Sequence, residues 1–232
     1  MTRAILTMDD GASSNTVRYV AFLNSLHISP LMFFWGERLE SAYEQGIKAL
    51  QMGAVAGNHS YSHPHFSDLS FAQCVAEIEK QEALLNRLYQ DAGIARSHKL
   101  FRFPYGDKGG KHAPMLQQYL MDQGFSRLED SGVTYPWYRE NGLRQDMDVF
   151  WTFDLKEYRM HNEEEFTLNH IYRHMEDPHP LQGGSLQDSG SLQIILIHDH
   201  PETEAKCPGY FKTLIRRLLK IGVVFENPDF CR

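Results

Sequence analysis

Short apolar runs alternate with amphipathic stretches along almost the whole chain, and this alternation limits the fold more than any other feature of the sequence. Alternating strands and helices favour parallel βαβ units. About seven such strands predict an α/β fold in which the strands form a distorted (β/α) barrel. The expected strands lie at 5–7, 30–35, 54–57, 100–103, 125–128, 149–154, 192–197 and 223–225, and the main helices at 16–26, 39–52, 70–91, 114–123, 163–175 and 210–220.

Length and composition agree with one globular domain over residues 1–232, since 42% of the residues are hydrophobic and 23% are charged. A net charge of -7 argues against a nucleic-acid partner. No apolar run approaches the roughly 20 residues that span a bilayer. The first strand begins almost at Met1, which leaves no signal peptide. We therefore expect either a cytoplasmic protein or a mature exported form recorded without its signal.

The first apolar run ends abruptly at two adjacent carboxylates, Asp9 and Asp10, followed by Gly11. Two like charges at the mouth of a buried strand repel each other, and a cation or a strong donor that offsets one charge stabilises such a pair. A solvated Asp-Asp turn is the simpler alternative, because Asp-Gly is common in turns.

Two histidines, His59 and His63, follow the third expected strand and lie four positions apart. In one helical turn, positions i and i+4 share a face, so both imidazoles can reach one ion. Asp10 is expected as the third ligand, since two histidines and one carboxylate with an open position suit a catalytic Zn²⁺ ion, and Co²⁺ or Ni²⁺ would also fit. Asp9 is then free to act as a general base. The alternative is a pair of surface histidines in a polar loop.

Arg102 and His198 end two further strands. The carboxyl ends of parallel strands meet at one end of a barrel, so one shared site is the economical explanation. Arg102 would then hold Asp9 ionised and oriented, and His198 would be the general acid that protonates a leaving amine. The alternatives are an exposed arginine at a strand edge and a histidine whose hydrogen bonds are satisfied at a barrel rim.

Five short motifs, taken in order, give the sequence a specific resemblance to a known family. They are Thr7–Gly11, His59–His63, Arg102–Gly106, Asp154–Tyr158 and Leu196–His198. The sequence resembles the polysaccharide deacetylase family, which is also called the NodB homology domain or carbohydrate esterase family 4. The resemblance implies a NodB-like barrel and a metal-dependent carbohydrate deacetylase.

The resemblance also implies a role for each matched residue. Asp9 corresponds to the catalytic base and Arg102 to the residue that orients it, while His198 corresponds to the general acid. Leu196 would line the acetyl pocket, and Tyr105 would lie at the substrate beside a backbone N–H that holds the oxyanion. The implied metal ligands are Asp10, His59 and His63.

The fourth motif departs from the family pattern, because Glu157 and Tyr158 stand where the family usually has Asp and Trp. Glu157 is expected to pair with Arg102 or with His198. Tyr158 would offer a smaller wall to a sugar ring. These changes bear on the substrate more than on the reaction.

The sequence thus predicts a metal-dependent hydrolase that removes N-acetyl groups from an acetylated glycan or amino sugar, and it leaves open whether O-acetyl groups are removed as well. One alternative is a C–N hydrolase of the same fold that acts on a small amide, imide or ureido compound. The missing export signal and the altered fourth motif favour it. A narrow, lidded pocket would support this alternative, and an open groove would support a glycan. Another alternative is a glycan-binding protein without activity, although such proteins usually lose the base or a metal ligand.

Overall fold

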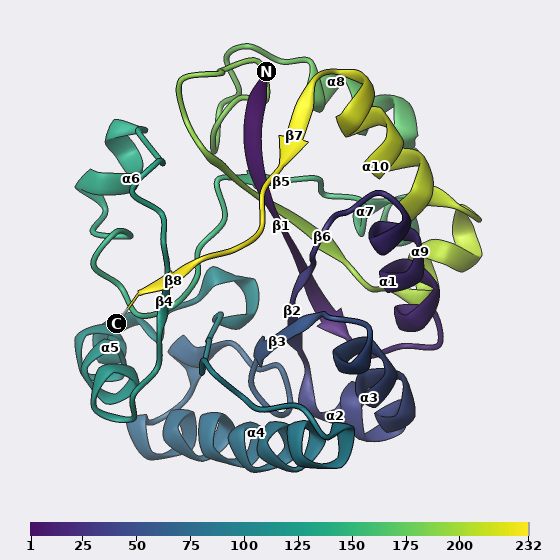
Figure 1. Ribbon diagram of the computed structural model, residues 1–232. Helices are drawn as coiled ribbons and strands as arrows, with labels where there is room; N and C mark the ends of the chain where they lie inside the picture. Colours follow the sequence, from purple (N-terminus) through teal and green to yellow (C-terminus); the bar gives the residue numbers. More distant parts are fainter. Residues whose placement is uncertain (232) are drawn as a thin grey trace.

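The structure is a computed structural model that describes residues 1–231, and its longest strand, β1, runs through the middle of the molecule (Figure 1). All neighbouring strands of the main sheet are parallel, in the order β3-β2-β1-β6-β5, and β7 also pairs with β1. The strands of this sheet are β1 (Thr2–Gly11), β2 (Leu31–Phe34), β3 (Val55–Asn58), β5 (Phe153–Asp154), β6 (Gln193–His198) and β7 (Val223–Phe225).

Single backbone hydrogen bonds continue the ring of strands beyond β3. The N–H of Asn58 donates to the carbonyl of Leu100 over 2.8 Å, and the N–H of Val149 donates to the carbonyl of Phe101 over 2.8 Å. The N–H of Thr152 then donates to Ile194 in β6 over 2.9 Å. The predicted α/β fold is confirmed. Its strands are arranged around a distorted barrel in which only some neighbouring strands form regular hydrogen-bonded ladders.

Two predicted strands are shorter than expected. Residues 100–103 contribute only an isolated bridge between Phe101 and Asn58. Residues 149–154 contribute only β5, because the hydroxyl and the carbonyl of Thr152 accept the N–H groups of Ile194 and Gly184, over 2.8 Å and 2.6 Å. The segment 125–128 was expected in the main sheet, but β4 (Arg127–Leu128) pairs antiparallel with β8 (Phe230–Cys231) in a separate two-stranded sheet.

The helices lie outside the strands, with α4 along one edge and α1, α8, α9 and α10 gathered on one side (Figure 1). The helix expected over 39–52 is two helices, because Ala42 leaves helical geometry at ψ 37°. Between β4 and β5 lies α6, in a segment where no helix was predicted. The helices are α1 (Thr16–Ser25), α2 (Gly36–Ser41), α3 (Tyr43–Gln51), α4 (Phe71–Ala92), α5 (Ala113–Asp122), α6 (Pro136–Glu140), α7 (Arg159–Asn162), α8 (Leu168–Met175), α9 (Pro201–Lys206) and α10 (Tyr210–Lys220).

Alternation along β1 divides the core into two layers, because successive side chains of a strand point to opposite faces. Leu6 and Met8 belong to the cluster shared with the helices, whereas Ile5 packs with Leu31 and Ile194 inside the ring. The side chains that point into the ring are apolar at the level of Ile5 and polar nearer the carboxyl ends of the strands. The fold therefore collects polar side chains at one mouth of the ring, above an apolar floor.

Two global features remain, the cysteines and the prediction about membranes. Cys74, Cys207 and Cys231 are all free. Among residues 1–231, no helix combines the length and the apolar character that crossing a bilayer requires.

Candidate active site

A β-bulge at the end of β1 brings two adjacent carboxylates to the same cavity. Asp9 is paired with Phe33 and Gly11 with Phe34, so Asp10 is an extra residue in the strand, and its φ is 64°. A bulge re-aims a side chain that regular alternation would send to the opposite face. Both Asp9 and Asp10 consequently line the cavity at the mouth of the ring.

Asp9 forms a buried ion pair with Arg102. The guanidinium Nη1 donates to Asp9 Oδ1 over 2.8 Å, and the Arg102 side chain is only 1% exposed. Arg102 also donates to Thr7 Oγ1 and to the Val149 carbonyl, each over 2.8 Å. This charge-assisted hydrogen bond is shielded from water and holds Asp9 in one orientation. The second oxygen of Asp9, Oδ2, then lies 3.6 Å from His59 Nε2.

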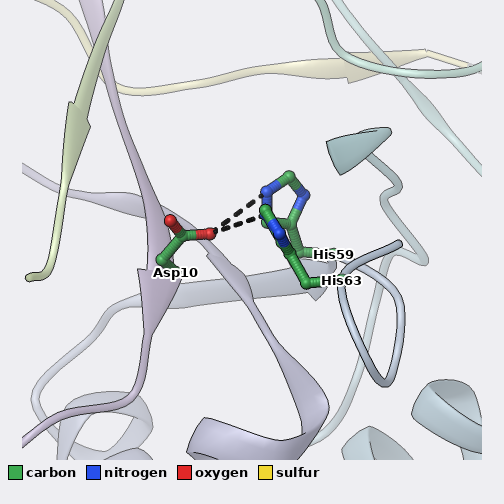
Figure 2. Close-up of side chains that lie close together, drawn as sticks. All are labelled: Asp10, His59 and His63. Atoms are coloured by element: carbon green, nitrogen blue, oxygen red, sulfur yellow. Dashed lines mark ion pairs between the residues drawn. The ribbon is translucent and has the colours of Figure 1, made fainter. Parts of the chain in front are cut away.

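His59 and His63 both face Asp10 (Figure 2). The Nε2 atoms of the two imidazoles lie 3.4 Å and 3.1 Å from Asp10 Oδ1. The indole of Trp35 stacks on the His63 ring with centroids 4.8 Å apart, and the Tyr105 ring meets the same imidazole edge-on at 4.6 Å.

The expectation that a helical turn carries these two histidines is wrong. Ser60 and His63 both have positive φ values, 61° and 59°, so the segment is an irregular loop. Glu77 in α4 imposes this shape, since its carboxylate accepts the N–H groups of Tyr61 and Ser62 over 3.1 Å and 2.7 Å. The amides of Tyr61 and Ser62 are thus satisfied by this side chain rather than by a helix.

The three facing groups fit a divalent cation. The His59 Nδ1–H donates to the Arg102 carbonyl over 2.8 Å, which leaves the Nε2 lone pair toward Asp10. Within the described chain, Asp10 Oδ1 is buried and makes no hydrogen bond, although two imidazole nitrogens lie near it. The donor atoms of Asp10, His59 and His63 all lie within 4.8 Å of one another. Two nitrogens and one oxygen are donors that Zn²⁺ accepts, and Co²⁺ and Ni²⁺ accept them as well.

Asp10 and His63 also have the protonation states that metal ligands require. Burial raises the pKa of Asp10, but His200, His59 and His63 lower it well below its usual value, so the carboxylate is ionised. Burial lowers the pKa of His63, which favours the neutral imidazole. Ligands bind metals in these forms, a carboxylate and a neutral histidine.

Glu157 pairs with His198 and not with Arg102, which decides between its two expected partners. Its Oε1 oxygen accepts from the His198 backbone N–H over 2.6 Å and lies 2.9 Å from His198 Nδ1, and its side chain is 0% exposed. Burial by itself lowers the pKa of His198, but the charge and hydrogen bond of Glu157 raise that pKa to about 10. Nearby, burial raises the pKa of Asp154 to about 6.

A cavity of about 470 Å³ unites the site. Among the predicted residues, Arg102 and Glu157 are absent from its wall and lie behind it, where each bonds to a side chain that lines it. The residues on the wall that were predicted as site residues are Asp9, Asp10, His59, His63, Tyr105, Tyr158, Leu196 and His198.

His200, for which the sequence predicted no role, also lines this cavity. Its Nε2 atom lies 2.6 Å from Asp10 Oδ2. The signal in the sequence was its position two residues after His198, at the end of the same apolar run.

Hollows adjoin the candidate active site on two sides. A larger cavity of about 890 Å³ shares Trp35 with it. Another of about 530 Å³ shares Trp151, Asp154 and Tyr158. Each of these two cavities thus has at least one wall residue in common with the candidate active site.

The sequence also matches known proteins. The model of the family described as polysaccharide deacetylase matches residues 2–123. A bifunctional xylanase/xylan deacetylase from Cellvibrio japonicus is 35% identical over 103 residues, which are 44% of this chain and 15% of that protein. A peptidoglycan-N-acetylglucosamine deacetylase from Bacillus cereus is 34% identical over 103 residues, which are 44% of this chain and 36% of that protein. The chain thus spans only 15% of the length of one relative and 36% of the length of the other.

Solved structures share the whole fold. The Bc1960 peptidoglycan N-acetylglucosamine deacetylase superposes with a TM-score of 0.66 at 21% identity, covering 97% of this chain and 85% of that one. A family 4 carbohydrate esterase from Streptomyces lividans gives 0.61 at 22% identity, covering 97% and 91%. A mutant of a pseudoenzyme of the same esterase family, BA3943, gives 0.59 at 17% identity, covering 97% and 65%. The fold alone therefore does not distinguish an active member from an inactive one.

Proposed function

Since this chain belongs to the polysaccharide deacetylase family, we propose that it hydrolyses the acetyl groups of an acetylated glycan, with residues 1–232 acting as one catalytic domain. One observation carries the proposal. A carboxylate paired with a buried arginine, a cluster of three possible metal ligands and a histidine paired with a buried glutamate all meet at one cavity.

The residues that would hold the metal are Asp10, His59 and His63, and Zn²⁺ is the ion that this donor set suits best. A bound divalent ion supplies a Lewis acid that polarises the acetyl carbonyl and makes water more acidic. Metal dependence is therefore part of the proposal.

The protein's own groups then divide the proton transfers. Asp9 accepts a proton from the attacking water, and Arg102 keeps its carboxylate oriented for that step. His198 donates a proton to the departing nitrogen, so that water and the N-acetyl group become acetate and a free amine. Glu157 keeps His198 protonated through its hydrogen bond. We assign the developing oxyanion to a backbone N–H beside Tyr105.

The surroundings of the site support a glycan over a small compound. Leu196 is 2% exposed and contributes an apolar part of the cavity wall, and Tyr158 flanks His198 with ring centroids 5.1 Å apart. We assign the two cavities that share wall residues with the site to neighbouring sugar units of the glycan. A small amide or ureido substrate would need no such extension.

The test is acetate release from N-acetylated sugars, chito-oligomers, peptidoglycan fragments and acetylated xylan, with chelated protein and after Zn²⁺ is restored. We expect release that requires the metal. Asp9→Asn is the matched control, because it should bind Zn²⁺ as the native chain does and release no acetate. Lack of release by native protein with confirmed bound metal would favour the small-molecule C–N hydrolase, and tight glycan binding without turnover would favour an inactive binding protein.

A further inference from the structure

We propose that His200 is a positioning residue that restricts Asp10 to a single oxygen for the cation and so keeps a coordination position open. This inference rests on the metal site of the proposed function. It concerns a residue of this chain that lies outside the three expected ligands.

The two oxygens of Asp10 have different surroundings. Oδ2 lies 2.6 Å from His200 Nε2, whereas Oδ1 faces His59 and His63 and makes no hydrogen bond within the described chain. An ionised carboxylate only accepts hydrogen bonds, so the proton between Asp10 and His200 belongs to His200 Nε2. This N–H occupies the oxygen that a two-oxygen binding mode would use.

The distinction matters for a catalytic ion. Catalytic zinc sites differ from structural ones in keeping a position free for water or substrate. A carboxylate that bound through both oxygens would occupy an additional position. By holding Oδ2, His200 leaves Asp10 with one oxygen to give, which preserves the room that the proposed reaction requires.

The surroundings of His200 hold its ring in place. The His198 imidazole stacks on one side with centroids 5.0 Å apart, and the His161 ring meets it edge-on at 5.3 Å. His161 is itself 2.7 Å from Thr203 Oγ1 through its Nδ1 atom. The His200 Nδ1 atom is buried and has no partner among residues 1–231, so the bond to Asp10 is the one polar contact that the imidazole makes there.

The backbone of the same segment is also anchored. The N–H of Asp199 donates to the Asp9 carbonyl over 2.9 Å, and the buried Asp199 carboxylate accepts the hydroxyl of Ser13 over 2.6 Å and that of Thr16. Asp199, which precedes His200, is thus hydrogen-bonded to residues that lie before and after Asp10 in the chain.

The experiment compares His200→Phe, which keeps a ring but loses the donor, with His200→Gln, whose amide nitrogen can reach a similar place. The matched control is His161→Phe, because His161 packs on His200 and does not touch Asp10. Zn²⁺ affinity is measured by competition with a chelator of known affinity, and the visible absorption spectrum is recorded after Co²⁺ loading. Both readouts are independent of turnover.

We expect His200→Phe to weaken Zn²⁺ binding by roughly 10- to 100-fold, the usual effect of losing a partner of a metal ligand, and to change the Co²⁺ spectrum. His200→Gln should restore most of the affinity, and His161→Phe should match the native chain. If His200→Phe does not fold, His200→Asn makes the same comparison, because its shorter amide leaves Oδ2 without a donor.

Native affinity together with a native Co²⁺ spectrum in folded His200→Phe, or in folded His200→Asn, would overturn this inference and leave the proposed function standing. A native chain that binds no divalent ion would overturn both. Native metal binding without acetate release would count against the proposed function alone.

Discussion

Replacing Glu157 by Gln should lower the pKa of His198 by three units or more. Burial by itself lowers that pKa, and the charge and hydrogen bond of Glu157 are the main influences that raise it to about 10 from an ordinary 6.5. A glutamine keeps the size of the side chain but not its charge. Burial then dominates over the smaller opposing influences of Asp10 and Asp154, and His198 should lose its proton near or below pH 6.5.

The size of this effect follows from the shift. One pKa unit corresponds to roughly 1.4 kcal/mol, so the net rise from 6.5 to about 10 stabilises the folded chain with a protonated His198 by roughly 5 kcal/mol. Because the folded-state pKa is raised, this stabilisation is fully present below pH 6.5 and is lost as the pH rises toward about 10. The native chain should therefore lose unfolding free energy over that window, and Glu157→Gln should lose far less.

Two measurements check the prediction. The His198 imidazole is titrated by NMR in metal-free protein, and the pH dependence of kcat/KM is measured with a substrate that releases acetate. In the native chain the alkaline limb should lie near pH 10, and in Glu157→Gln it should move to neutral pH, because a general acid must carry its proton. Glu157→Asp is the control, since it keeps the charge and should retain most of the shift.

A His198 that still titrates near pH 10 in folded Glu157→Gln would refute the assignment of this carboxylate as the cause. A native His198 that titrates near pH 6.5 would refute the reasoning as well, because burial would then outweigh the pair.

Three further predictions concern the other parts of the site. Asp9→Asn should reduce kcat by at least about 100-fold, the lower end of what a general base contributes. Its Zn²⁺ affinity, measured by equilibrium dialysis, should equal that of the native chain. Turnover within a few-fold of native would show that Asp9 is not the base. Arg102→Met should cost about 3–5 kcal/mol in urea unfolding, because it leaves the Asp9 charge buried and unpaired, and a loss under about 1 kcal/mol would contradict the buried pair. Zn²⁺ at about 100 times its Kd should stabilise the native chain by about 2.7 kcal/mol in the same assay but leave Asp10→Ala unaffected, so equal stabilisation of both would place the ion elsewhere.

The order of elements could be predicted because it depends on local periodicity. Helix α10 spans the predicted residues 210–220, and α4 at Phe71–Ala92 lies within one residue of the predicted 70–91. The polar residues at strand ends met as predicted, since parallel strands bring their carboxyl ends to one side.

Features that depend on distant side chains could not be predicted. The loop of His59 and His63 takes its shape from Glu77, which lies 14 residues beyond His63 and in a different element. Glu157 pairs with His198 because the segment before it lies beside β6, where the Leu155 N–H donates to the Leu196 carbonyl over 3.1 Å. No local pattern carries that information.

The bulge at Asp10 has a consequence for how the site tolerates motion. The proposed base and the proposed metal ligand are neighbours in the chain, so their separation is set by covalent geometry and one backbone conformation. Small movements of the strands or of the outer helices therefore displace Asp9 and Asp10 together. What such motion can alter is the distance from this unit to the loop of His59 and His63, so a loosened fold should lose its ion before it loses the spacing between base and ligand.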